Sequence, residues 1–151
     1  MTLYGLSYTT FDLSSRVRIS SLSRGSNITS LPPAHGTVPG ANPHLWDILY
    51  SITASVKNTG NVAGATVPQL YLTLPALSPN DNATTYILRG FEKVRLGPGE
   101  TQDVTFALNR RDISRWDVVR QQWAIPRGEI GVAVGFSSRD FRARGVFVPI
   151  A

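Results

Sequence analysis

The sequence predicts an all-β protein, folded as a two-sheet antiparallel sandwich. Several segments alternate between apolar and polar residues, which is the pattern of a strand that buries one face. Turn-forming Gly, Pro, Asn and Asp residues separate these segments at short intervals. The chain has 151 residues, 42% of them hydrophobic, so residues 1–151 can bury a core as a single domain. About seven strands of this kind fit two packed antiparallel sheets.

Three strands are expected in the first half of the chain. A short one lies near 17–19. A longer one lies at 48–56, where every second residue is apolar: Ile48, Tyr50, Ile52, Ala54 and Val56. The sequence Asn58-Thr59-Gly60 ends this strand, since Asn and Gly tolerate the positive φ of a turn. The third strand, at 70–74, is flanked on both sides by proline.

The second half of the chain contains the remaining strands. One is expected at 88–96, with Gly90 marking a bulge, and Gly97-Pro98-Gly99 forms the turn that follows. Further alternating segments predict strands at 104–108, 130–136 and 141–148.

Two segments interrupt this pattern. Residues 21–45 are rich in Ser, Pro, Gly and Asn and predict a long surface loop between the first two strands. In the second, residues 110–116, Asp112 is expected to cap one helical turn by accepting hydrogen bonds from amides ahead of it. A short hairpin is expected from Trp116 to Trp123.

The chain is basic, with 15 Lys and Arg residues against 10 Asp and Glu, a net charge of +5. Acidic residues stand close to basic ones along the chain, as in Asp12 and Arg16, Asp112 and Arg111, or Asp140 and Arg139. This mixture favours a solvated surface of exposed ion pairs. Binding to nucleic acid is the alternative, but the aromatic residues do not interleave with a basic run. Arginine also suits carboxylates of a neighbouring domain.

Composition excludes several classes of site. The chain has no cysteine, and hence no disulfide, thiolate nucleophile or thiolate metal site. No apolar run reaches the ~18 residues of a membrane span, and residues 1–4 do not resemble the start of a signal peptide. Neither His35 nor His44 belongs to a known catalytic or zinc motif. We expect no cofactor and no metal.

Seven short motifs cover nearly the whole chain except 21–45 and 76–85: GLSYTTF (5–11), VKNTGNVAG (56–64), PQLYL (68–72), LRGF (88–91), LGPGE (96–100), DISRWD (112–117) and VGFSSRD (134–140). In this order they resemble one family: the C-terminal fibronectin type III-like module of family 3 glycoside hydrolases, fungal β-glucosidases in particular. The resemblance implies an immunoglobulin- or fibronectin type III-like sandwich. It also implies that the catalytic residues belong to other domains of a secreted β-glucosidase.

The residue pattern likewise leads us to expect that this chain alone is not an enzyme. Retaining glycoside hydrolysis requires two carboxyl groups about 5–5.5 Å apart in a sugar-binding cleft. Asp112 and Asp117 are the nearest pair of aspartates in sequence, but capping explains Asp112 more simply. No phosphate-binding glycine loop is present.

Two roles remain besides the polyanion binder, which ranks last. In the first, the domain packs on the catalytic domains of the same polypeptide and stabilises them, through candidate contacts at Tyr4, Leu6, Tyr8 and Phe11. In the second, it binds lignin or cellulose by aromatic stacking and by cationic attraction to acidic groups of lignin. The candidate residues for the second role are Trp46, Tyr86, Arg110, Arg111, Arg115, Trp116, Arg120 and Trp123. Packing of the tryptophans in the core or at its rim is the simpler interpretation.

Two sequons, at Asn27 and Asn82, are candidate N-glycosylation sites. Together with the family resemblance, they lead us to expect an extracellular protein. We expect neither nucleic acid nor a membrane among its partners.

Overall fold

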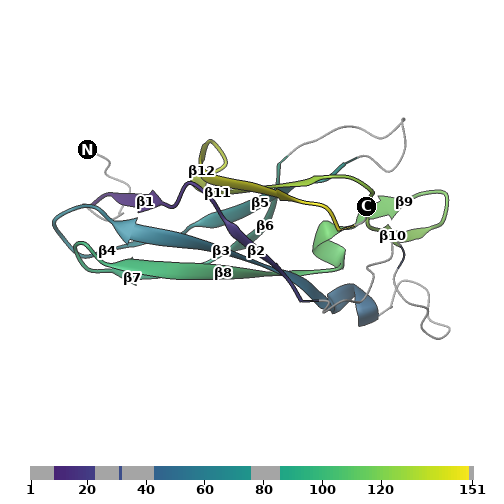
Figure 1. Cartoon of the computed structure of the whole chain (residues 1–151), viewed down its shortest axis with the longest axis horizontal. Coiled ribbons are helices and arrows are strands. Elements are labelled where there is room, and N and C mark those ends of the chain that lie inside the picture. Colours follow the sequence, from purple (N-terminus) through teal and green to yellow (C-terminus); the bar gives the residue numbers. More distant parts are fainter. Residues whose placement is uncertain (1–8, 23–30, 32–42, 76–85, 150–151) are drawn as a thin grey trace.

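The computed structural model describes residues 9–22, 31, 43–75 and 86–149. In these residues the chain forms two layers of antiparallel strands (Figure 1), as the alternating pattern predicts. The elements, in chain order, are β1 (Phe11–Leu13), β2 (Arg18–Ser21), the 3₁₀ helix η1 (Pro43–Trp46), β3 (Ile48–Asn58), β4 (Gly64–Thr66), β5 (Gln69–Thr73), β6 (Ile87–Phe91), β7 (Val94–Leu96), β8 (Thr101–Asn109), the 3₁₀ helix η2 (Arg111–Ile113), β9 (Arg115–Asp117), β10 (Gln122–Ala124), β11 (Ile130–Ser137) and β12 (Asp140–Phe147).

The first sheet is built around the long strand β3. Strand β8 pairs with β3 along one edge, and β1 and β2 share the other edge one after the other. From Tyr50 to Asn58 every second side chain of β3 is buried, which confirms the alternation seen in the sequence. At the start of the strand the pattern is reversed: Ile48 is exposed and Leu49 is buried, next to an irregularity in the pairing with β8.

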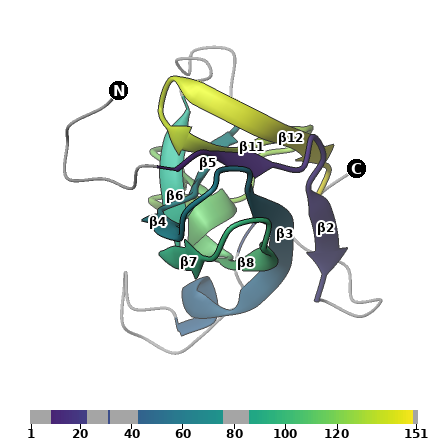
Figure 2. The same ribbon diagram turned by 90° about the vertical axis from the view of Figure 1, so that its left-hand side faces the viewer.

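The second sheet has the strand order β12-β11-β5-β6. Figure 2 shows β11 and β12 on one side of the sandwich and β3 and β8 on the other. Between β1 and β2 the chain reaches this second sheet, where Arg16 forms an isolated parallel bridge with Arg144. The N-terminal segment therefore joins the two layers at one edge.

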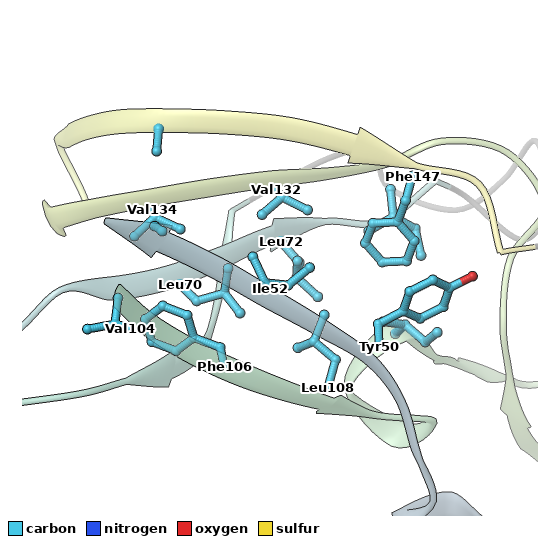
Figure 3. Close-up of a cluster of buried hydrophobic side chains, with 14 of the residues drawn as sticks. Tyr50, Ile52, Leu70, Leu72, Val104, Phe106, Leu108, Val132, Val134 and Phe147 are labelled. Carbon is cyan, nitrogen blue, oxygen red and sulfur yellow. The ribbon is translucent and has the colours of Figure 1, made fainter. Parts of the chain in front are cut away.

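The core lies between the two sheets. Ile52 and Leu108 from the first sheet face Leu70 and Leu72 from the second (Figure 3), and all four are fully buried. At one end Tyr50 packs on Phe147, with ring centres 4.4 Å apart. Burial of side chains this size contributes about 1.5–3 kcal/mol each relative to exposure, so the sandwich has a core of its own.

The segment 88–96 is divided, whereas the sequence predicted one strand. Strand β6 pairs with β5, but β7 pairs with β4 instead. The predicted irregularity at Gly90 is present: Leu70 is opposite Gly90 and the next residue, Tyr71, is opposite Leu88. Arg89 is thus the extra residue of a bulge. Splits of this kind raise the strand number above the seven expected.

Asn58 does not end β3 by adopting a positive φ, as the sequence suggested. Among the described residues other than glycine, only Gln121 has a positive φ, and neither Asn58 nor Gly60 does. Instead the buried amide of Asn58 donates to the carbonyls of Val62 (2.8 Å) and Leu96 (3.0 Å). Its Oδ1 accepts from the amide of Gly60 at 2.9 Å. The side chain satisfies backbone groups that the end of the strand leaves unpaired.

Most of the predicted loop 21–45 lies outside the described residues. Its last part forms η1, and Asp47, just after this helix, accepts a hydrogen bond from the backbone amide of Arg110 (2.9 Å). No helix in the described ranges is long and apolar enough to cross a membrane.

The ion pairs in the described part of the chain are exposed, as expected, but several partners are distant in sequence. Arg142 contacts both Asp12 (3.5 Å) and Asp140 (3.0 Å), and Arg18 contacts Asp103 (2.7 Å). The predicted partners Arg16 and Arg139 do not form these pairs. The fold decides the pairing: β1 lies close to β12, and Arg18 of β2 reaches across β3 to Asp103 of β8.

Candidate polymer-binding and interdomain surfaces

The predicted Trp116–Trp123 hairpin is present and extends from one end of the sandwich (Figure 1). Trp116 of β9 and Trp123 of β10 are directly opposite each other, and their rings meet edge-on with centres 5.5 Å apart. At the tip, Asp117 Oδ1 accepts from the amides of Val119 (3.0 Å) and Arg120 (3.2 Å). An Asx turn of this kind lets such a short connection close.

Arg111 lies directly over the Trp123 ring, with its Cζ 3.5 Å from the ring centre. The helix η2 positions it. Here the structure corrects the predicted capping: Asp112 Oδ2 accepts from the amide of Asn109 behind it (3.0 Å), while Asn109 Oδ1 accepts from the amide of Asp112 (2.8 Å). Asn109 is therefore the capping side chain, and Asp112 reaches back as in a capping box.

The four candidate arginines differ in exposure. Arg110 is only 5% exposed, and burial lowers the pKa of its guanidinium, so it does not belong to a binding surface. Arg111 and Arg115 are half-buried. Arg120 is exposed at the hairpin tip, 3.8 Å from the carboxylate of Asp117.

The candidate aromatic residues fall on separate surfaces. Trp46 on η1 and Trp116 on the hairpin are 64% and 42% exposed, so neither packs in the core, and Trp123 is half-buried beneath Arg111. Tyr86 lies elsewhere, on the outer face of the second sheet, where its hydroxyl accepts from Arg144 at 2.8 Å. The structure thus brings together Arg111, Trp116 and Trp123, which we call the hairpin cluster, and leaves Tyr86 outside it.

The candidate interdomain and glycosylation residues are mostly beyond the described ranges. This applies to Tyr4, Leu6, Tyr8, Asn27 and Asn82. Phe11 is described, and it packs against the domain's own core from β1.

The two aspartates nearest in sequence both have structural partners. Asp112 binds the Asn109 amide, and Asp117 binds the amides of the hairpin tip. Within the described residues no group of three His, Asp or Glu side chains is arranged to hold a metal ion. His44 contacts Asp47 through Nδ1 at 3.0 Å.

Sequence reasoning missed an aromatic cluster on the outer face of the second sheet. The Phe141 ring lies 4.5 Å from Tyr86 and 5.2 Å from Tyr71, centre to centre, and the guanidinium of Arg144 lies 5.4 Å from Phe141. These residues come from three strands or their flanks. Only the strand order brings them together, so no single segment of sequence signals the cluster.

The two-sheet antiparallel fold agrees with a known class of domain. Residues 66–138 match the family described as fibronectin type III-like domain. This part of the chain is thus similar to a fibronectin type III-like domain, as its motifs predict.

Two fungal proteins named as probable β-glucosidases are similar to this chain along almost its whole length. It is 48% identical to probable beta-glucosidase G of Emericella nidulans over 148 residues and 49% identical to the Aspergillus oryzae protein of the same name over 147 residues. These alignments cover 98% and 97% of this chain but only 18% of each relative.

Solved structures of β-glucosidases are also similar to this chain. The beta-D-glucoside glucohydrolase of Trichoderma reesei is similar with a TM-score of 0.81 and 39% identity, over 98% of this chain and 20% of that one. A family 3 glycoside hydrolase β-glucosidase of Neurospora crassa gives a TM-score of 0.78 at 27% identity, over 95% of this chain and 25% of that one. The chain corresponds to the fibronectin type III-like part of such enzymes, and the resemblance drawn from the motifs is confirmed.

Proposed function

We propose that this chain is the accessory domain of a β-glucosidase, and that it stabilises the catalytic domains of the same polypeptide by packing against them. The observation that carries the proposal is the 48% identity across 98% of the chain to a probable β-glucosidase of which it spans 18%. Hydrolysis of cellobiose or other β-glucosides then belongs to the remaining part of the parent enzyme.

Two features of the domain support a structural role. Its core is complete between the two sheets, so its surface is available for contacts without loss of the fold. The carboxylates of Asp112 and Asp117 are occupied by backbone amides that shape η2 and the hairpin. A domain that binds the folded state of its neighbour raises the stability of that neighbour.

Deletion of residues 1–151 from the parent enzyme tests this proposal. We expect the temperature of half-inactivation to fall, while the KM of the protein that remains folded changes little. Unchanged heat resistance and expression in the deletion variant would contradict a stabilising role.

The second candidate function is binding to lignin or cellulose through the hairpin cluster. The observation that favours it is the exposed ring of Trp116 beside Trp123, with the Arg111 cation stacked above. An exposed ring can stack on a sugar or phenolic face, and the nearby cations attract acidic groups of lignin.

Retention of the isolated domain on each polymer distinguishes the two functions. Trp116→Ala should reduce retention, while Phe91→Ala, which removes an exposed ring on the second sheet, should leave it unchanged. Loss of retention at high salt identifies the ionic contribution. Equal retention of the two variants, or no retention of the wild-type domain, argues against this function.

We also propose that the parent enzyme is secreted, on the basis of the sequons at Asn27 and Asn82. A mass decrease after endoglycosidase treatment of the native protein is expected. A native intracellular protein that carries no glycan would contradict the proposal.

A further inference from the structure

The two outer faces of the sandwich differ in chemistry. On the first sheet, the outward side chains in the middle of β3 and β8 are polar and form hydrogen bonds with one another and with Arg18 of β2. Thr53 Oγ1 and Thr105 Oγ1 are 3.1 Å apart, and Asp103 accepts from Ser55 (2.6 Å) and from Arg18 (2.7 Å). This is the composition of a solvated face.

The outer face of the second sheet is apolar. Along one row Arg144, Ala133, Tyr71 and Leu88 are neighbours across β12, β11, β5 and β6, and Phe141 and Phe91 lie in the adjacent row. The alternate residues of these strands, such as Leu70 and Val132, fill the core, so this set points outward.

Several of these outward side chains are strongly exposed: Phe91 at 68%, Val146 at 59%, Leu88 at 46% and Tyr86 at 40%. Single exposed apolar residues are common on soluble proteins. A set on β12 and on β6 with its flanking residue, all on one sheet face, is a different feature and indicates an interaction surface.

Arg144 lies within this apolar set. Its guanidinium donates to Tyr86 and lies near the Phe141 ring, and none of the ion pairs in the described ranges includes it. Beside it is a shallow hollow of about 310 Å³ floored by β11, lined by Tyr86, Gly131, Val132, Arg144, Gly145 and Val146. A guanidinium covered by a partner needs a carboxylate or other acceptor, because an uncompensated buried charge is costly.

We propose that this face, formed by Tyr86, Leu88, Phe91, Phe141, Arg144 and Val146, is where the domain docks on the remainder of its parent polypeptide. The matching surface carries apolar side chains and a carboxylate that enters the hollow and pairs with Arg144. This inference rests on the proposed function and assigns the face that performs it.

Two considerations select this occupant. The relatives contain a remainder several times longer than the matched part, since this chain spans 18% to 20% of them. Tethering to that remainder gives an effective concentration of roughly millimolar, so a modest interface is sufficient. Domain interfaces within one chain bury roughly 600–1,500 Å² and are more polar than obligate dimer interfaces.

The test uses the intact parent enzyme with one substitution at a time. Phe91→Asp and Val146→Asp place a charge on the proposed face, Arg144→Gln removes its cation, and Thr101→Asp is the matched control on the first sheet's exposed face. We expect the three face variants to lower the half-inactivation temperature toward that of the parent lacking residues 1–151. The control should behave as wild type. The isolated domain should unfold at nearly the same temperature with each substitution, which excludes a defect of folding.

The outcomes separate this inference from the proposed function. If deletion of the domain has no effect, the proposed function fails. If deletion destabilises the parent but the face variants do not, the domain stabilises through another surface and this inference is wrong. Self-association of the isolated domain, or its retention on cellulose or lignin, that Phe91→Asp abolishes would assign the face to another occupant and would also overturn it.

Discussion

The guanidinium of Arg111 stacks on Trp123, its Cζ 3.5 Å from the centre of the ring. The contact joins η2, which follows strand β8 of the first sheet, to the hairpin formed by β9 and β10. Each strand of the hairpin is only three residues long. An isolated two-stranded hairpin of this size has marginal stability in water. Its order therefore depends on contacts such as this one.

We expect Arg111→Ala to loosen the hairpin, because a cation on an aromatic face contributes about 0.5–1 kcal/mol at partly exposed sites. Trp123 fluorescence should shift toward that of a solvated indole, and hydrogen exchange in β10 should accelerate. Arg111→Lys retains the charge but loses the planar stack, so it should have an intermediate effect. Unchanged fluorescence and exchange in both variants would show that the stack does not order the hairpin.

Replacement of Asn58 should be among the most damaging polar substitutions. Asn58→Ala removes the donors to two carbonyls and the acceptor for Gly60, and leaves those groups without partners in a fully buried position. Each unsatisfied group costs about 1–3 kcal/mol, so we expect a loss of about 3 kcal/mol or more in urea unfolding. Thr59→Ala, at the exposed neighbouring position, is the control and should change stability by less than about 1 kcal/mol. Equal effects of the two would contradict the role of the buried amide.

Two glycines should respond to alanine for different reasons. A Cβ at Gly135 would lie 2.0 Å from the carbonyl oxygen of Asp140, so Gly135→Ala must displace the β11–β12 hairpin. At Gly99 a Cβ meets nothing within 4 Å, but φ is +75°, and alanine costs about 1–2 kcal/mol in that left-handed conformation. We expect the loss at Gly135 to be the larger of the two in thermal unfolding. The opposite order would contradict the close approach of β12.

The pKa of Asp103 should lie below its ordinary value, chiefly because Ser55 donates to the carboxylate and also because Arg18 is adjacent. A lowered pKa in the folded state means that the carboxylate stabilises the fold above its unfolded pKa. That contribution is lost as the pH falls through the folded pKa. NMR titration of Asp103 checks this: Ser55→Ala and Arg18→Ala should each raise the pKa. If neither substitution moves the titration, these contacts do not persist in solution.

The architecture was predictable because periodicity reports directly on burial. The alternation at 48–56 and at 130–136 identifies strands whose inward residues, such as Ile52 and Val134, are fully buried. Local polar geometry was less predictable. Asp112 and Asn109 exchange hydrogen bonds, and a residue pattern does not say which of two side chains caps the turn.

The surfaces were hardest to predict because they depend on strand register. Residue type alone places Tyr86 and Trp46 among the same candidate polymer-binding residues as the hairpin. In the structure, Tyr86 instead belongs to a cluster with Phe141 and Arg144. Residue type also places Arg110 at the surface, yet it is buried, while its neighbour Arg111 is half-buried. Neighbours across strands 50 or more residues apart in sequence decide these positions, and a single sequence does not contain that pairing explicitly.

Calorimetry of the intact parent enzyme, compared with that of the isolated domain, tests the central claim most directly. If the domain stabilises its neighbours by packing on them, the domain and the neighbouring domains will unfold together in one transition of the parent. The domain's transition will then occur at a higher temperature than in isolation. An independent transition of the domain inside the parent, at the temperature of the isolated chain, would contradict the claim.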